Sequence, residues 1–304
     1  MTARRAVISL GTNTVRLLIV EDGQEGGVHQ LEHRAIGTRL GEGLVERGML
    51  ADAAMDRTLD AVRSFVALAR ANGARLTGIA TSAMRRAENA SAFAQRFAQI
   101  AGVPLRVIDG EEEAASSFRG ATYDDGAQAH RVAVLDIGGG STECAVGMHG
   151  RVERSVSLEI GTVRLTERFP ELSGSAPGAP ARNAAQRAHV FVGNVAGALG
   201  RFGPIEELRA VAGTPATIGA ILAASDVDHV RGMLLSRGSV AFVRDRLLDA
   251  SLEERRRIPG MLAQRADVLA AGCIILLEAL DYLGCSGARV ETNDLLLGQL
   301  LTPE

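Results

Sequence analysis

The sequence predicts an α/β protein built from two similar lobes. Its 304 residues exceed the roughly 100–200 residues of a common single domain, so two domains are expected. Apolar strands alternate with amphipathic helices through the first half, which is typical of α/β architecture. The hydrophobic pattern around Ser9 returns around Asp136, 127 residues later. A repeat on this scale predicts two related lobes that face each other across a ligand-binding cleft.

The first predicted elements are two apolar strands joined by a short polar turn. They lie in VISLGTNTVRLLIV, residues 7–20, and a glycine-rich connection follows through Gly41 and Gly43. Apolar residues at intervals of three and four then predict a helix over 51–71, which Asn72-Gly73 ends. A strand at 75–81, a helix at 91–101 and a strand at 103–108 complete this series.

Three adjacent glutamates, residues 111–113, open the next predicted helix, which ends near Gly120. A helix N-terminus tolerates negative charge. Three carboxylates on one turn cannot all face solvent, so we expect one of them to point into the cleft. The polar stretch 123–126 marks the predicted boundary between an N-terminal lobe, residues 1–123, and a C-terminal lobe, residues 124–304.

The second half repeats the opening and then becomes mainly helical. A strand that begins at Ala129, a glycine turn and a hairpin of strands at 143–148 and 151–158 form the repeat. Residues 170–180, PELSGSAPGAP, predict an irregular loop. A helix at 184–199 and a strand at 208–212 follow, and a further helix begins at Pro215. The longest helix predicted in the C-terminal third covers 262–283. A last strand at 288–291 and a helix that ends at Leu301 complete the chain.

Composition indicates a globular protein without a broad basic surface. Hydrophobic residues make up 46% and charged residues 23% of the chain, and the net charge is −3. This balance argues against general binding to DNA or to a membrane surface. No lysine is present, so arginine forks and backbone N–H groups would have to recognise any phosphate.

Three further features predict a cytoplasmic protein. The three cysteines have no C-x-x-C spacing, which favours structural thiols in a reducing compartment. The N-terminus lacks the apolar core of a signal peptide. The longest charge-free apolar run, Val268–Leu277, is much shorter than the roughly 20 residues that span a bilayer.

The second glycine turn contains residue types that are suited to binding phosphate and Mg²⁺. Three glycines let a backbone approach a phosphate closely, and the hydroxyls that follow them add donors. Asp136 precedes this turn and Glu143 follows it. Carboxylate oxygens beside a phosphate cradle are ligands that Mg²⁺ prefers. The turn runs from Gly138 through Gly139, Gly140 and Ser141 to Thr142.

The chain resembles the Ppx/GppA family of exopolyphosphatases and guanosine pentaphosphate phosphohydrolases, within the actin-like ATPase superfamily. Seven segments in family order carry the resemblance. They are ISLGTNTVRLLIV (8–20), ATSAMR with AEN (80–85 and 87–89), DGEEEA (109–114), DIGGGSTE (136–143), GTVRLTE (161–167), GTPAT (213–217) and RADV (265–268).

The resemblance implies two ribonuclease-H-like lobes with a cleft between them and a helical C-terminal third. It also implies a homodimer and Mg²⁺-dependent hydrolysis of a terminal phosphoanhydride, in inorganic polyphosphate or in guanosine penta- or tetraphosphate. Glu113 would orient the attacking water, and Asp136 and Glu143 would hold the metal. The implied phosphate-binding residues are Gly11, Thr12, Asn13, Thr14, Arg16, Arg85, Gly138, Gly139, Gly140, Ser141, Thr142, Arg164, Gly213 and Thr214.

The chain departs from the family pattern at two places. Ser9 stands where the family has aspartate, so we expect a lower affinity for the cation. Residues 290–298 read VETNDLLLG instead of a pattern like VSDRGLREG, which puts Asn293 and Leu296 in place of arginines. Arg86 replaces a usual aspartate.

Three hypotheses therefore stay open at the sequence level. The first is an active exopolyphosphatase or pppGpp phosphohydrolase, because Glu113, Asp136, Glu143 and Arg85 are all present. The second is a weakly active or inactive phosphate or nucleotide sensor of the same fold, because of Ser9 and the altered C-terminal segment. The third, a phosphotransferase of the wider superfamily, is disfavoured by the glutamate triplet.

Overall fold

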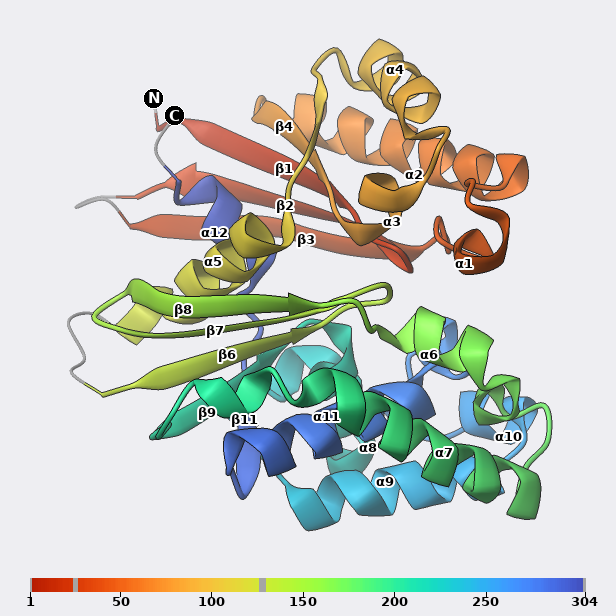
Figure 1. The fold of residues 1–304 in the computed structure, drawn as a ribbon. Helices are drawn as coiled ribbons and strands as arrows, with labels where there is room; N and C mark the ends of the chain where they lie inside the picture. Colours follow the sequence, from red (N-terminus) through yellow and green to blue (C-terminus); the bar gives the residue numbers. More distant parts are fainter. Residues whose placement is uncertain (1, 24–26, 126–129, 303–304) are drawn as a thin grey trace.

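Two mixed β-sheets with helices on their faces make up the protein (Figure 1). The computed structural model describes residues 2–23, 27–125 and 130–302. The predicted α/β fold with two sheets is confirmed. No helix in these three ranges is long and apolar enough to cross a membrane.

The first sheet has the strand order β3-β2-β1-β4-β5. Its first three strands are antiparallel neighbours, and β4 and β5 continue the sheet in parallel with β1. β3 was not predicted, because eight of its ten residues are exposed and give no apolar alternation. The strands are β1 (Arg4–Leu10), β2 (Thr14–Asp22), β3 (Val28–Gly37), β4 (Arg75–Ala80) and β5 (Leu105–Val107).

The helices predicted in the first half are confirmed. α2 and α4 lie where the apolar periodicity placed them, and α5 opens with the three glutamates, with Asp109 as its N-cap. The short α1 and α3 were not predicted, since four or five residues show no period. The helices are α1 (Leu44–Arg47), α2 (Asp52–Ala71), α3 (Ser82–Arg86), α4 (Ala90–Ala101) and α5 (Gly110–Ala121).

The second sheet has the order β10-β11-β9-β6-β7-β8 and repeats the plan of the first. Strands β6, β7 and β8 are antiparallel neighbours, and β9 and β11 continue in parallel. The predicted start of β6 at Ala129 lies outside the described residues. The strands are β6 (Val132–Ile137), β7 (Thr142–Met148), β8 (Arg151–Leu158), β9 (Glu207–Val211), β10 (Leu234–Ser236) and β11 (Gly287–Val290).

Two helix predictions in the second half are wrong at their N-terminal ends. Residues 170–180 are not one loop: they hold a 3₁₀ turn, Pro170–Ser173, and the start of α7, where Pro180 lies in the first turn. The helix predicted over 262–283 begins only at Leu269, and with 15 residues it is shorter than α7 with 18. Residues 263–265 form a separate 3₁₀ turn that directs Arg265 to the cleft.

The helices of the second half follow in chain order. They are α6 (Thr162–Arg168), α7 (Ala179–Ala196), α8 (Gly213–Ala223), α9 (Arg237–Asp249), α10 (Leu252–Arg256), α11 (Leu269–Leu283) and α12 (Leu295–Leu300).

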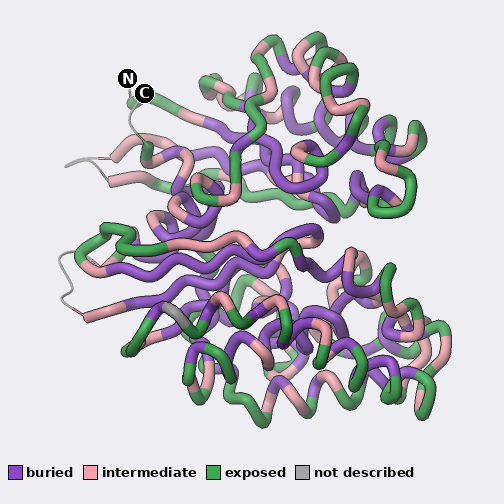
Figure 2. Tube along the Cα trace, in the orientation of Figure 1, coloured by how far each residue is buried: buried purple, intermediate pink, exposed green. Residues whose placement is uncertain are grey.

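Two helices lie between the sheets, and each packs on the sheet of the other half (Figure 1). α5, from the N-terminal half, packs on β6, β7 and β8, and Phe118 joins their core. α12, from the C-terminal half, packs on β1, and its leucines join the core on that face of the first sheet. Both sheets are therefore buried on two faces, as Figure 2 shows for their central strands. The division at residue 123 stays a prediction.

Candidate active site

The two glycine-rich turns form the centre of the candidate site. One joins β1 to β2 and the other joins β6 to β7. Both are closed by the same hydrogen bond: the Gly11 amide donates to the Thr14 carbonyl at 3.1 Å, and the Gly138 amide donates to the Ser141 carbonyl at 3.0 Å. The repeat predicted from the sequence is thus also a repeat of backbone geometry.

The two turns touch, and glycine is what lets them approach. A Cβ on Gly140 would lie 2.5 Å from Thr12 Oγ1 and 2.7 Å from Ser82 Oγ. A Cβ on Gly139 would lie 3.1 Å from the Asn13 amide nitrogen. A larger residue at either position would force the facing turn or its side chains to shift.

A small polar pocket of about 60 Å³ lies between the turns. Since one water needs roughly 10–15 Å³, this space suits a phosphoryl group or a few waters rather than a nucleoside. None of the described residues that line it is aromatic. The lining residues are Ser9, Gly11, Thr12, Asn13, Thr14, Arg16, Thr81, Ser82, Glu113, Asp136, Ile137, Gly138, Gly139, Gly140, Ser141, Ala212, Arg265 and Leu295.

Several buried polar atoms have no hydrogen-bond partner within the described residues, and those of Thr12, Asn13 and Thr14 belong to residues that line the pocket. Buried polar groups in proteins are normally paired, so a cluster of unpaired ones fits a site for a polar ligand. The atoms are Thr12 Oγ1, Asn13 Oδ1 and Nδ2, Thr14 Oγ1, Glu143 Oε2, Thr162 Oγ1 and Thr214 Oγ1.

Glu113 is the one glutamate of the triplet that points inward. It lies in the first turn of α5 and is 7% exposed, whereas Glu111 is exposed and Glu112 partly exposed. Arg85 Nη1 donates to Glu113 Oε2 at 2.7 Å. Burial raises the pKa of Glu113 to about 7, although the Arg85 guanidinium opposes this. A carboxylate with a pKa near neutrality suits a general base.

Asp136 and Glu143 lie on the facing pair of strands β6 and β7. Asp136 accepts a hydrogen bond from Ser117 Oγ at 2.7 Å, and burial raises its pKa. Glu143 accepts from Ser157 Oγ at 2.7 Å, and burial together with the charges of Glu113 and Asp136 raises its pKa well above the ordinary value. Buried carboxylates whose charges repel one another, one of them with an oxygen that has no partner among the described residues, are an environment that a divalent cation would stabilise.

The described residues alone do not supply a complete set of metal ligands. In the described part of the chain, no group of three or more His, Cys, Asp or Glu side chains is arranged to hold an ion. Mg²⁺ commonly binds through one or two carboxylates and takes its other ligands from substrate phosphates and water. Asp136 and Glu143 fit that partial mode of binding.

Arg265 is a site residue that the sequence reasoning did not assign. It comes from the 3₁₀ turn before α11 and lines the pocket. Within the described residues its guanidinium makes no hydrogen bond or ion pair, and burial and the nearby Arg16 lower its pKa to about 10. An unpaired guanidinium beside the glycine turns is suited to bind a phosphate. The only sequence signal was its place in the RADV segment.

Five of the predicted phosphate-binding residues do not line the pocket: Arg85, Thr142, Arg164, Gly213 and Thr214. Arg164 Nη1 donates to the Gly140 carbonyl at 3.3 Å and lines a separate cavity of about 580 Å³ near α1 and α6, together with four glutamates. Thr142 Oγ1 donates to the Ile160 carbonyl at 2.7 Å. Gly213 lies under the Arg265 guanidinium, and Thr214 is buried with an unpaired hydroxyl.

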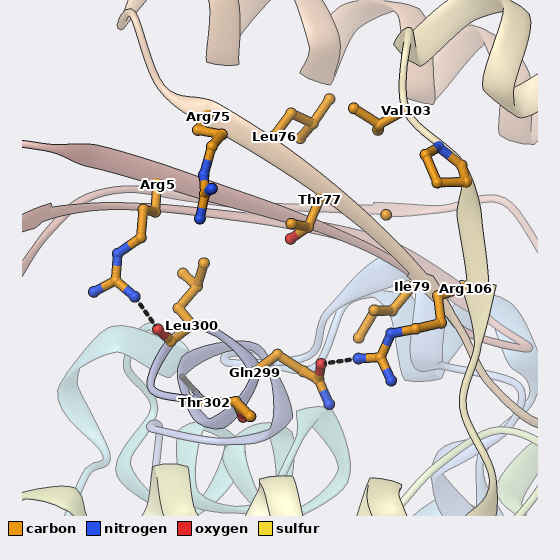
Figure 3. Close-up of a pocket in the computed structure, with 12 residues that line it drawn as sticks. Arg5, Arg75, Leu76, Thr77, Ile79, Val103, Arg106, Gln299, Leu300 and Thr302 are labelled. Atoms are coloured by element: carbon orange, nitrogen blue, oxygen red, sulfur yellow. Dashed lines mark hydrogen bonds between the residues drawn. The ribbon is translucent and has the colours of Figure 1, made fainter. Parts of the chain in front are cut away.

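A larger cavity of about 410 Å³ lies at the outer side of α12 (Figure 3). Arg5, Arg75 and Arg106 line it around an apolar floor that includes Leu76 and Ile79. None of the described residues that line it carries a carboxylate, so these residues offer neither a carboxylate base nor a carboxylate ligand for a metal. We therefore assign the chemistry to the smaller pocket between the glycine turns.

The raised pKa values lead to a stability prediction for Glu143→Gln. The pKa of Glu143 is higher in the folded protein than in the unfolded chain, so the charged carboxylate lowers the free energy of unfolding. This destabilisation begins as pH rises above the pKa of an unfolded glutamate, roughly 4.3. Without divalent cations, Glu143→Gln should raise the Tm by a few degrees at pH 7.5 and by less at pH 5. Thermal unfolding followed by circular dichroism measures both values.

A matched control for Glu143→Gln is Glu207→Gln. Hydrogen bonds from Arg209 and His130 outweigh burial and lower the pKa of Glu207, so removing this charge should lower the Tm at pH 7.5. An equal gain for Glu143→Gln at both pH values would contradict the charge-repulsion account.

The fold and the pocket together define a class: an α/β protein with two repeated sheets, whose two glycine turns and a buried glutamate line one small polar pocket. The sequence model of the Ppx/GppA phosphatase family matches residues 19–292. The chain belongs to this family, whose named members are phosphoanhydride hydrolases.

Individual relatives agree with this membership. The chain is 33% identical to exopolyphosphatase 2 of Mycobacterium tuberculosis over 318 aligned positions, which cover 98% of both chains. It is 30% identical to a guanosine-5'-triphosphate,3'-diphosphate pyrophosphatase of Vibrio vulnificus, over 91% of this chain and 54% of that one. The structure of an exopolyphosphatase from Cytophaga hutchinsonii superposes with a TM-score of 0.88 at 27% identity, over 98% of this chain and 96% of that one.

Proposed function

We propose that this protein is an Mg²⁺-dependent exopolyphosphatase that releases terminal orthophosphate from inorganic polyphosphate. The observation that carries the proposal is Glu113, a buried carboxylate with a pKa of about 7, which lines the pocket between two phosphate-binding turns. The proposed general base, the two glycine turns and the side chains of Arg16 and Arg265 thus line one pocket.

Positioning and charge neutralisation are what phosphoryl transfer mainly requires. Hydroxyl and amide groups of Thr12, Asn13 and Ser141 face the pocket and can donate to phosphate oxygens. Arg265 contributes a guanidinium that has no partner among the described residues. Arg16 contributes a second guanidinium, which is paired with Asp294. Together they would hold the terminal phosphate and balance its charge.

Asp136 and Glu143 are the residues that would hold Mg²⁺. Bound there, Mg²⁺ would supply Lewis-acid stabilisation of charge on the phosphate oxygens. Glu143 Oε2 is buried and has no hydrogen-bond partner among the described residues, as expected of an oxygen that is available to a cation. Ser117 keeps Asp136 oriented through its 2.7 Å hydrogen bond.

Glu113 would act on the nucleophile. A water attacks the terminal phosphorus, the bond from that phosphorus to the bridging oxygen breaks, and the shortened chain leaves with the bridging oxygen. The proton of the water passes to the Glu113 carboxylate and returns to solvent after release. Arg85 holds the carboxylate in place through the 2.7 Å hydrogen bond to Oε2.

Pocket size supports polyphosphate as the substrate. A volume of about 60 Å³ accepts a terminal phosphate, and none of the described residues that line it is an aromatic side chain on which a base could stack. The relative from Mycobacterium tuberculosis, named an exopolyphosphatase, aligns over 98% of its own length. A pppGpp 5'-phosphohydrolase is the second candidate, favoured by the Vibrio vulnificus relative. The homodimer and the cytoplasmic location stay predictions.

A phosphate-release assay tests the proposal. Long-chain polyphosphate, pppGpp and ATP are each incubated with the protein, with Mg²⁺ and with EDTA instead. We expect Mg²⁺-dependent release from polyphosphate, slower release from pppGpp and little from ATP. Faster release from pppGpp would reverse the order of the two candidates. If no phosphate were released from any of the three substrates at high enzyme concentration, the hydrolase proposal would be refuted and a role in binding phosphate or nucleotide would be favoured.

A further inference from the structure

Asp294 holds a fixed carboxylate beside the pocket. It immediately precedes α12, and its Oδ1 accepts a hydrogen bond from the Leu296 amide at 3.0 Å. Its Oδ2 forms an ion pair with the Arg16 guanidinium. The side chains of Arg16 and Asp294 are only 17% and 8% exposed. Water therefore screens this pair far less than it screens a surface pair.

The far end of α12 is also tied to the first sheet. Arg5 donates to the Leu300 carbonyl, and Arg106 Nη2 donates to Gln299 Oε1 at 2.6 Å (Figure 3). The helix is thus held at both ends, which fixes the position of Asp294 relative to β2.

The internal repeat shows what Asp294 replaces. In the second sheet, Asp136 and Glu143 are direct cross-strand partners. The equivalent partners in the first sheet are Ser9 and Arg16. Residues directly opposite on antiparallel strands project from the same face, so a carboxylate at position 9 would lie within reach of Arg16. Ser9 has no charge, and the carboxylate that pairs with Arg16 comes from residue 294.

Without Asp294, Arg16 would have a different electrostatic environment. The carboxylates whose charges act on Arg16 are Asp294, Asp136 and Glu113. If Asp294 were neutral, the Arg16 guanidinium would be attracted mainly to the carboxylates of Asp136 and Glu113. An arginine paired with Asp136 would compete directly with a cation for that carboxylate.

We propose that Asp294 is a positioning residue that keeps Arg16 away from Asp136, in the place of the carboxylate missing at Ser9. The inference rests on the proposed function only for the assignment of the pocket as a phosphate and cation site. It goes beyond that function because it gives residue 294 a role in keeping Asp136 available to a cation.

The test is a double-mutant cycle of Asp294→Asn and Ser9→Asp. Asparagine keeps an oxygen for the Leu296 amide and removes only the charge. The readout is Mn²⁺ binding in the presence of methylenediphosphonate, an analogue of pyrophosphate that is not hydrolysed, measured by the electron paramagnetic resonance signal of free Mn²⁺. Asp22→Asn is the control, because Asp22 pairs with Arg5 on the same sheet, away from the pocket.

Asp294→Asn should weaken Mn²⁺ binding roughly tenfold, a change of about 1.4 kcal/mol. Ser9→Asp should tighten binding in the wild-type background and restore it in the Asp294→Asn background, while Asp22→Asn leaves it unchanged. Wild-type affinity in folded Asp294→Asn, or no rescue by Ser9→Asp, would overturn the inference. Because turnover is not measured, a protein that binds the analogue without hydrolysing polyphosphate would refute the proposed function alone.

Discussion

Glu113→Gln is expected to lower kcat for polyphosphate hydrolysis by roughly 10²–10⁴-fold, the usual contribution of a general base. Glutamine keeps the size of the side chain and can still accept the hydrogen bond that Arg85 donates, but it cannot take a proton from water. Binding of a non-hydrolysed analogue should change little. Steady-state phosphate release and analogue titration measure the two quantities separately.

The matched control is Glu112→Gln, in the same turn of α5. Glu112 is partly exposed and pairs with Arg106 at the outer side of the helix, so its loss should leave kcat unchanged. In the wild-type protein kcat/KM should rise as pH increases through about 7, because the base must be deprotonated. Turnover within threefold of wild type in Glu113→Gln would remove Glu113 from the mechanism.

Gly161→Ala is expected to lower kcat/KM by about 100-fold, because a displacement near 1 Å at an active site can cost that much. A Cβ at position 161 would lie 2.4 Å from the Gly139 carbonyl carbon and 2.5 Å from the Gly140 amide nitrogen. Both are backbone atoms that cannot rotate away, so the second glycine turn must move. Steady-state kinetics with polyphosphate test this expectation.

Gly238→Ala is the control for the glycine prediction. Gly238 lies in α9, and a Cβ added at this position would be 3.9 Å from its nearest neighbour, Ser236 Oγ. Alanine is a better helix former than glycine, so this variant should be at least as stable as wild type and fully active. If Gly161→Ala behaved like Gly238→Ala, the close packing of residues 161 and 139 would have no part in the function.

Features encoded by neighbouring residues could be predicted from the sequence. Both glycine turns follow from short apolar strands around small polar residues, and the inward position of one glutamate follows from crowding in one helical turn. The structure brings Glu113, Asp136 and the residues of both turns to a single pocket. Their roles in binding and catalysis stay predictions.

Features that depend on distant contacts could not be predicted in this way. Arg265 reaches the pocket because a 3₁₀ turn interrupts an apolar run that looked like continuous helix. Asp294 pairs with a residue 278 positions earlier in the chain. β3 is an exposed strand whose place is set by hydrogen bonds to β2 rather than by a hydrophobic pattern. No local periodicity carries this information.

The position of α12 also determines the order in which the protein can be completed during synthesis. The core on the inner face of the first sheet includes Leu295, Leu296, Leu297 and Leu300 beside Val7 and Leu18. These partners are separated by nearly the whole length of the chain. A nascent chain therefore carries an uncovered face on its first sheet until α12 has left the ribosome, and Arg16 gains its Asp294 partner in the same step.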